Sequence, residues 1–147
     1  MGAAMSDPLI LSVPISSDLG TLALEVRRQV FILEQSVPEA LERDAYDATA
    51  THLVAIDHGN VVGTLRIVFL PEHAKFGRVA VLRHARGKGV AMAMMRVAMD
   101  VAKELGQVRF YLTAQSDKIG LYEKLGFVAF GDEFEEGGMP HRAMKTY

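Results

Sequence analysis

The sequence has 147 residues, which corresponds to one domain at the usual length of about 150 residues per domain. Half of the residues are hydrophobic and 23% are charged, a composition that indicates a folded globular protein and argues against extensive disorder. Because there is no cysteine, disulfides, thiolate metal sites and cysteine nucleophiles are excluded. A net charge of −2 disfavours nucleic acid as a partner.

We predict one domain over residues 1–147, with residues 1–6 disordered or a cloning remnant. No run of about 18 apolar residues occurs, so neither a membrane span nor a membrane partner is expected. The N-terminus lacks the charged, apolar and cleavage-site order of a signal peptide. We therefore expect a cytoplasmic protein.

The first half of the chain predicts two helices between strands. Residues 8–13 (PLILSV) indicate a short buried strand, and Ser17 lies in a polar cluster typical of a helix N-cap. Pro38 and Glu39 open a second, short helix. The apolar positions that predict the first helix by their spacing are Leu22, Val26, Val30 and Leu33.

The second half alternates strands and helices. Strands are predicted over 51–56, 61–70, 76–81, 108–114, 127–130 and 141–147. Helices are predicted from about residue 90 to Leu105 and over 117–125, each closed by a glycine. Since hairpins lie beside strand–helix–strand units, we predict an α+β (layered α/β) fold. It would contain a mixed, mostly antiparallel, twisted sheet of six to seven strands flanked by about four helices.

The segment with the clearest chemistry leads from strand 76–81 into the long helix. Gly87 and Gly89 lie just before this helix, whose N-terminus offers unpaired N–H groups and partial positive charge. Glycines let a ligand approach the backbone, and Arg86 and Lys88 add cations, so the segment is suited to a phosphate or pyrophosphate. The simpler alternative is a solvated charged loop. Neither of the two familiar nucleotide motifs, G-x-x-x-x-G-K-[ST] and G-x-G-x-x-G, fits here.

Three motifs together resemble one superfamily. The pattern Arg86-x-x-Gly89-x-Ala91 resembles the [QR]-x-x-G-x-[GA] signature of the GNAT acetyltransferases, which bind acetyl-coenzyme A. Residues 78–81 (RVAV) precede it as they do in that superfamily, and residues 121–127 (LYEKLGF) are similar to its F-Y-x-K-x-G-F segment. The resemblance implies a GNAT fold.

A narrower resemblance covers nearly the whole chain. Residues 26–35 (VRRQVFILEQ) resemble the V-R-x-x-V-F-x-x-E-Q opening of the ElaA/YjcF-like group. Residues 113–115 (TAQ) and 138–141 (GMPH) are also similar to that group, although Thr113 stands where the group has Asn.

The resemblance implies that acetyl-coenzyme A, as cosubstrate, lies between two splayed strands, 78–82 and 108–114. Backbone groups of two valines would pair with its pantetheine arm, and the amides of the glycine-bearing loop would hold its pyrophosphate. The implied binding residues are Val79, Ala80, Val81, Arg86, Gly87, Lys88, Gly89, Val90 and Ala91. No metal-ligand motif is present, so no metal is expected.

Three residues are candidates for proton transfer. By the resemblance, the Tyr122 hydroxyl lies beside the sulfur and protonates the departing thiolate; the alternative is a core tyrosine. His141 is the candidate base, since histidine titrates near neutral pH; the alternative is a structural histidine bonded to backbone. By the resemblance, Glu34 borders the acceptor cleft, where it would attract an amine or act as a base through water; the alternative is a solvated helix end.

The other candidates are weaker. His52 opens a strand and is a second histidine that can face the cleft, whereas His73 and His84 are expected in exposed loops. The acidic run over residues 132–136 is expected as a solvated loop, with the alternative that it discourages anionic acceptors.

The expected function is N-acetyl transfer from acetyl-coenzyme A to a primary amine of a small molecule or peptide. Without a cysteine to carry the acyl group, direct attack in a ternary complex is expected. The alternative is a coenzyme A-binding sensor or interaction module without catalysis. The oligomeric state stays open, and a homodimer would cover the edges of such a small sheet.

Overall fold

The computed structural model describes residues 7–147, and the prediction for residues 1–6 lies outside the described residues. Seven strands form one sheet in the order β1-β2-β3-β4-β5-β7-β6. The strands are β1 (Leu9–Val13), β2 (Thr51–Asp57), β3 (Asn60–Phe69), β4 (Ala74–Val81), β5 (Phe110–Gln115), β6 (Val128–Glu136) and β7 (Met139–Lys145). The α-helices are α1 (Asp18–Arg27), α2 (Glu39–Glu42), α3 (Val90–Glu104) and α4 (Ile119–Glu123). The predicted mixed, mostly antiparallel sheet is confirmed.

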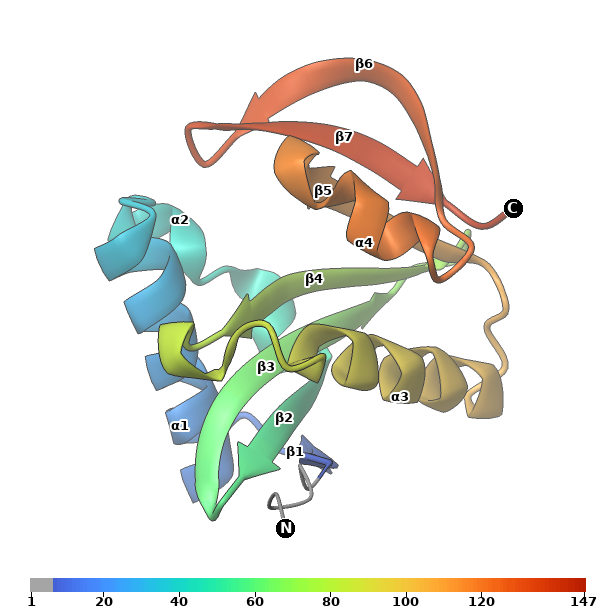
Figure 1. Cartoon of the computed structure of the whole chain (residues 1–147). Coiled ribbons are helices and arrows are strands. Elements are labelled where there is room, and N and C mark those ends of the chain that lie inside the picture. The colour runs from blue at the N-terminus through green and yellow to red at the C-terminus, as the bar shows by residue number, and fades with distance from the viewer. Residues whose placement is uncertain (1–6) are drawn as a thin grey trace, which may run out of the picture.

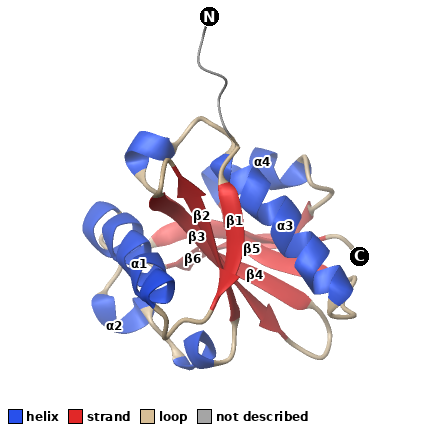
Figure 2. Ribbon diagram, turned by 90° about the horizontal axis from the view of Figure 1, so that it is seen from below, coloured by secondary structure: helices blue, strands red, loops and turns tan. Residues whose placement is uncertain are grey.

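The sheet is buried between two layers of helices. Figures 1 and 2 show α1 on one face and α3 with α4 on the other. Successive residues of β2 alternate between these layers, so Leu53 packs in the core with Met94 of α3 while Val54 packs with Ala23 of α1. Burial on both faces explains why β2 is an unbroken apolar run rather than an alternating one.

The sheet opens between β4 and β5. These strands are parallel and pair only from Ala74–Phe110 to Phe76–Leu112, beyond which they diverge. Beyond this pairing, β4 carries a bulge against β3, and Arg78 adopts the left-handed conformation there, with φ of 52°. The divergence of the two strands agrees with the splay implied by the resemblance.

The first long helix differs from its prediction. The α-helix ends at Arg27, and the chain continues as the π-helical segment η1 (Arg28–Glu34), closed by a hydrogen bond from Gln35 N to Val30 O of 3.1 Å. Of the four apolar positions that predicted one helical face, Val26 and Val30 are buried, whereas Leu22 and Leu33 are exposed. The predicted apolar face is therefore only partly correct, and hydrophobic spacing did not reveal the π-helical segment. Its end lies beside β4 and carries Glu34 and Gln35.

The C-terminal hairpin is longer than predicted. β6 extends through the acidic run to Glu136, which was expected as a loop, and β7 begins at Met139 rather than His141. Charged residues suit an exposed edge strand, so the acidic composition concealed the strand. Gly137 and Gly138 form the two-residue turn with φ of 59° and 80°, as this hairpin type requires.

His73 also corrects a prediction. It is buried rather than in an exposed loop, stacks on Tyr111 with ring centroids 4.4 Å apart, and places Nδ1 2.8 Å from the Tyr147 hydroxyl. The partners come from β5 and the C-terminus, which local sequence around His73 does not indicate.

Candidate functional site

A cavity of about 1000 Å³ lies where β4 and β5 diverge. It is lined by η1, β4, the loop before α3, β5, α4 and the β6–β7 turn. The structure brings Glu34, Tyr122 and His141 to this one cavity, although they are far apart in sequence. Eight of the nine predicted cofactor-binding residues also line it, namely Val79, Ala80, Val81, Arg86, Gly87, Gly89, Val90 and Ala91. Lys88 is exposed and does not line it.

The loop before α3 is open to a ligand. Gly87 and Gly89 have φ of 77° and 79°, and Gly89 is the N-cap of α3. A Cβ added at either glycine would meet no protein atom within 4 Å, so the space beside the backbone is free. The first N–H groups of α3, a helix of 15 residues, have no partner within the helix. This geometry suits an anionic group such as a diphosphate.

Arg86 is held by a carboxylate from η1. Its Nη1 and Nη2 donate to Glu34 at 2.6 and 2.8 Å, and its Nε donates to Val81 O at 2.8 Å. The hydrogen bonds from Arg86 lower the pKa of Glu34. A carboxylate held in the charged form by arginine is a weak base, so this geometry makes Glu34 a link between η1 and the loop.

Tyr122 of α4 lines the cavity. The residue is only 8% exposed, and burial raises its pKa to about 12. Within residues 7–147 no fully buried side-chain oxygen or nitrogen lacks a hydrogen-bond partner. The Tyr122 hydroxyl is therefore not a buried polar group without a partner. The phenol is therefore protonated at neutral pH and can donate a proton but not accept one.

His141 of β7 is oriented by the backbone. Its Nδ1 lies 2.8 Å from Met139 O, and because a carbonyl only accepts, Nδ1 carries the hydrogen and Nε2 the lone pair of the neutral ring. Nε2 lies 3.5 Å from Oε2 of Glu136, which in turn accepts a hydrogen bond from Thr113 Oγ1 at 3.0 Å. Sequence reasoning missed Glu136 because it treated the acidic run as solvated.

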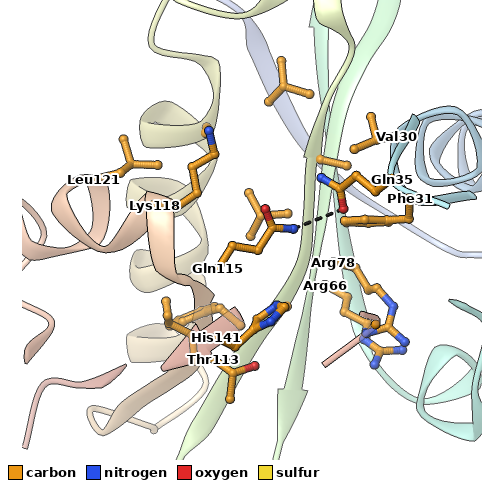
Figure 3. Close-up of a pocket in the computed structure, with 18 of the residues that line it drawn as sticks. Val30, Phe31, Gln35, Arg66, Arg78, Thr113, Gln115, Lys118, Leu121 and His141 are labelled. Carbon is orange, nitrogen blue, oxygen red and sulfur yellow. Dashed lines mark hydrogen bonds between the residues drawn. The ribbon is translucent and has the colours of Figure 1, made fainter. Parts of the chain in front are cut away.

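A side-chain bridge crosses the cavity. Gln115 Nε2, at the end of β5, donates to Gln35 Oε1, just after η1, at 3.1 Å (Figure 3). Both residues belong to segments that the resemblance singled out, but neither motif indicated their contact. The bridge joins the two walls that the splay separates.

A buried ion network lies behind the cavity wall. Arg27 is 1% exposed and bonds Glu42 and Asp47, while Arg66 bonds both oxygens of Asp44 at 2.6 and 2.8 Å and Asp47 at 2.9 Å. Burial of Asp47 would raise its pKa, but hydrogen bonds from the two arginines outweigh burial and lower it.

His52 belongs to the same region and is not a cavity residue. Its Nε2 lies 2.8 Å from Asp47 O.

In residues 7–147, no group of three or more His, Cys, Asp or Glu side chains is placed to hold a metal ion. Over the same range no helix is long and apolar enough to cross a membrane.

Comparisons with known proteins agree with this architecture. YyaT of Bacillus subtilis, an uncharacterized protein, is 34% identical over 125 residues, which cover 83% of this chain and 84% of that protein. YjcF of the same organism, an uncharacterized N-acetyltransferase, is 32% identical over 123 residues, covering 83% and 88%. The structure of an acyl-CoA N-acyltransferase from Pseudomonas aeruginosa superposes with a TM-score of 0.84 at 27% identity, covering 95% and 99%.

ElaA of Escherichia coli superposes with a TM-score of 0.83 at 26% identity, again covering 95% of this chain and 99% of that one. The acetyltransferase (GNAT) domain family matches residues 15–147, nearly all of the described chain. These likenesses confirm the superfamily and the narrower ElaA/YjcF-like group. The chain belongs to the acetyltransferase (GNAT) domain family and is an acyltransferase of the ElaA/YjcF-like group.

Proposed function

We propose that this acyltransferase moves an acetyl group from acetyl-coenzyme A to a primary amine by direct transfer in a ternary complex. The observation that carries the proposal is the meeting, in one cavity, of an open glycine loop, a protonated phenol and a histidine with an available lone pair. The chain has no cysteine that could hold the acyl group between two half-reactions.

The donor would be bound by backbone rather than by side chains. The N–H groups at the start of α3 and the free space beside Gly87 and Gly89 suit its pyrophosphate. β4 has no strand partner on its β5 side beyond Phe76, which leaves room for an extended arm at Val79 and Val81. Acetyl-coenzyme A would supply an activated thioester, and the chain supplies its position.

Two side chains would move the protons. His141 Nε2 would take the proton of the attacking amine, with Glu136 stabilising the resulting imidazolium. Tyr122 would give its proton to the departing thiolate. Glu34 would not transfer a proton, because Arg86 holds its carboxylate in a bidentate pair. It would instead hold the glycine loop against η1.

Calorimetric titration with acetyl-coenzyme A, followed by assay of free thiol with a panel of primary amines, tests the proposal. Binding together with amine-dependent thiol release supports it. Binding without any amine-dependent release would point to a coenzyme A-binding module, and absence of binding by the folded protein would refute the donor site.

Replacing Gly89 by tyrosine is expected to weaken acetyl-coenzyme A binding by roughly tenfold or more, about 1.4 kcal/mol at least. The ring would occupy the free space beside the loop. Gly59→Tyr is a matched control, because Gly59 has nearly the same φ, 78°, and equally open surroundings but lies in the β2–β3 turn.

Both of these variants carry similar backbone strain, so both should lose a similar free energy of unfolding, on the order of 1–2 kcal/mol. Calorimetry on both proteins separates the two effects. Equal affinity in Gly59→Tyr and Gly89→Tyr would show that the loop does not hold the donor.

Replacing His141 by glutamine is expected to lower kcat/KM by about 100-fold, a typical contribution of a general base. The exposed His84 does not line the cavity, and His84→Gln is the control. If His141→Gln kept the kcat/KM of His84→Gln, another group or water would take the proton.

A further inference from the structure

Arg78 differs from the other two arginines of the buried network. Arg27 and Arg66 each bond carboxylates at ordinary distances. Arg78 instead donates Nε to Glu42 O at 3.0 Å and Nη2 to Leu41 O at 3.2 Å, both of which are neutral carbonyls. Its one carboxylate contact, to Asp44 Oδ2, is long at 3.4 Å.

The carboxylate nearest to Arg78 is already committed elsewhere. Asp44 gives both of its oxygens to Arg66, at 2.6 and 2.8 Å. The pKa values reflect this difference: burial and the nearby charges of Arg66 and Arg27 lower the pKa of Arg78, whereas carboxylates raise those of Arg27 and Arg66 against the effect of burial. Among residues 7–147, the one carboxylate paired with the partly buried Arg78 is thus Asp44, at 3.4 Å, and Arg66 shares it at shorter distances.

Arg78 also faces the site. It lies on the bulge of β4, lines the cavity, and makes no hydrogen bond through Nη1 to residues 7–147. In Figure 3, Arg66 and Arg78 lie on one side of the central strands, and His141 and Thr113 lie on the other side. All four line the same cavity, so an acceptor bound there would meet both a base and a guanidinium whose carboxylate contact is long.

We propose that the acceptor is a free amino acid whose carboxylate is bound by Arg78 while its amine faces His141. An arginine that shares its carboxylate with a closer arginine gains a strong, charge-assisted contact from a carboxylate ligand. Phe31, Val68 and Leu70 line the same cavity and suit an apolar side chain. Of the acidic run, only Glu136 lines the cavity, so the run as a whole does not exclude an anionic acceptor.

The reaction balances without a further reagent. The amine nitrogen forms a bond to the acetyl carbon as the carbon–sulfur bond breaks, giving an N-acetyl amino acid and the coenzyme thiol. His141 takes the amine proton, Tyr122 supplies the thiol proton, and the carboxylate bound by Arg78 is unchanged. This inference rests on the proposed function.

The test compares glycine, leucine and phenylalanine with their own amides as acceptors, by thiol release from acetyl-coenzyme A. Each pair keeps the amine and the side chain and differs in the carboxylate. We expect kcat/KM to favour the free acids by about 10- to 100-fold. Near neutral pH the amides hold more neutral amine, so intrinsic reactivity works against this expectation.

Variants then assign the preference to Arg78. Arg78→Gln is expected to bring the amino acids down to the level of their amides, Arg78→Lys to keep part of the preference, and Arg96→Gln to keep all of it. Arg96 is an exposed cation of α3 outside the cavity. The Kd for acetyl-coenzyme A should be the same in all of them. If Arg78→Gln does not fold, the preference of the wild type for amino acids over their amides, and its partial loss in Arg78→Lys, still test the proposal.

Failure of the proposed function and failure of the carboxylate site give different results. No binding of acetyl-coenzyme A would refute the proposed function itself. Binding with equal or better use of the amides, with no turnover of any of the three amino acids, or with an undiminished preference in folded Arg78→Gln, would refute only the carboxylate site.

Discussion

Tyr122→Phe is expected to lower kcat by about 100-fold and to leave the Kd for acetyl-coenzyme A unchanged. The substitution removes one oxygen from a buried ring and keeps its packing, so the loss would be that of a proton donor. Because burial raises the pKa of Tyr122 to about 12, the phenol stays protonated at every pH up to about 10. The wild-type profile of kcat should accordingly show no alkaline fall due to this group below that pH.

Tyr111→Phe is the matched control for this experiment. Tyr111 is a partly buried tyrosine of β5 that packs on His73 and does not line the cavity. Removal of the Tyr111 hydroxyl should leave kcat within about twofold of the wild-type value. If Tyr122→Phe turned over as fast as Tyr111→Phe, the leaving thiolate would take its proton from water and Tyr122 would be a packing residue only.

Arg27→Met is expected to lower the free energy of unfolding by about 3–5 kcal/mol. The substitution leaves Glu42, 2% exposed, and Asp47 without their strongest partner in the interior. Domains of this size are stable by only about 5–15 kcal/mol, so the variant would lie close to unfolding. Urea denaturation followed by circular dichroism measures the loss.

The next residue in the chain gives the control. Arg28 is also an arginine, but it is 46% exposed and bonds the exposed Glu25, so Arg28→Met should leave the free energy of unfolding nearly unchanged. Similar losses in the two variants would show that the buried pairs contribute no more than a surface pair.

The difference in free energy of unfolding between wild type and Arg27→Met should become smaller as the pH is lowered. The folded-state pKa of Asp47 lies below its ordinary value of 3.8, so the stability that this carboxylate contributes is present above that pH and is lost as the pH falls. The variant lacks part of that contribution at every pH. Urea denaturation of wild type and Arg27→Met, at neutral pH and near pH 3, measures this difference at the two pH values.

The sequence predicted those parts of the site that lie within one short segment of the chain. The loop with Gly87 and Gly89 was visible because two glycines and two cationic residues stand directly before a predicted helix, and both glycines adopt left-handed backbone in the structure. Tyr122 was visible through its place in a motif, and the structure brings it to the same cavity.

What sequence reasoning missed depends on contacts between distant segments. Arg27 and Arg66 bond carboxylates closely because Asp44 and Asp47 come from a separate turn, whereas Arg78 bonds two main-chain carbonyls and reaches Asp44 only at 3.4 Å. No periodicity encodes which of three arginines has the longest carboxylate contact. The pairing of Glu34 with Arg86 likewise spans 52 residues.

The junction between β4 and β5 gives the cavity an unusual dependence on the hydrophobic interior. Since only three residue pairs join these strands, aromatic packing maintains their separation: the Phe76 ring lies 5.4 Å from Phe110 and 6.3 Å from Phe127. Neither Phe110 nor Phe127 lines the cavity. The width available to substrates is therefore set in part by side chains that no substrate touches, and specificity can drift through mutations of the core.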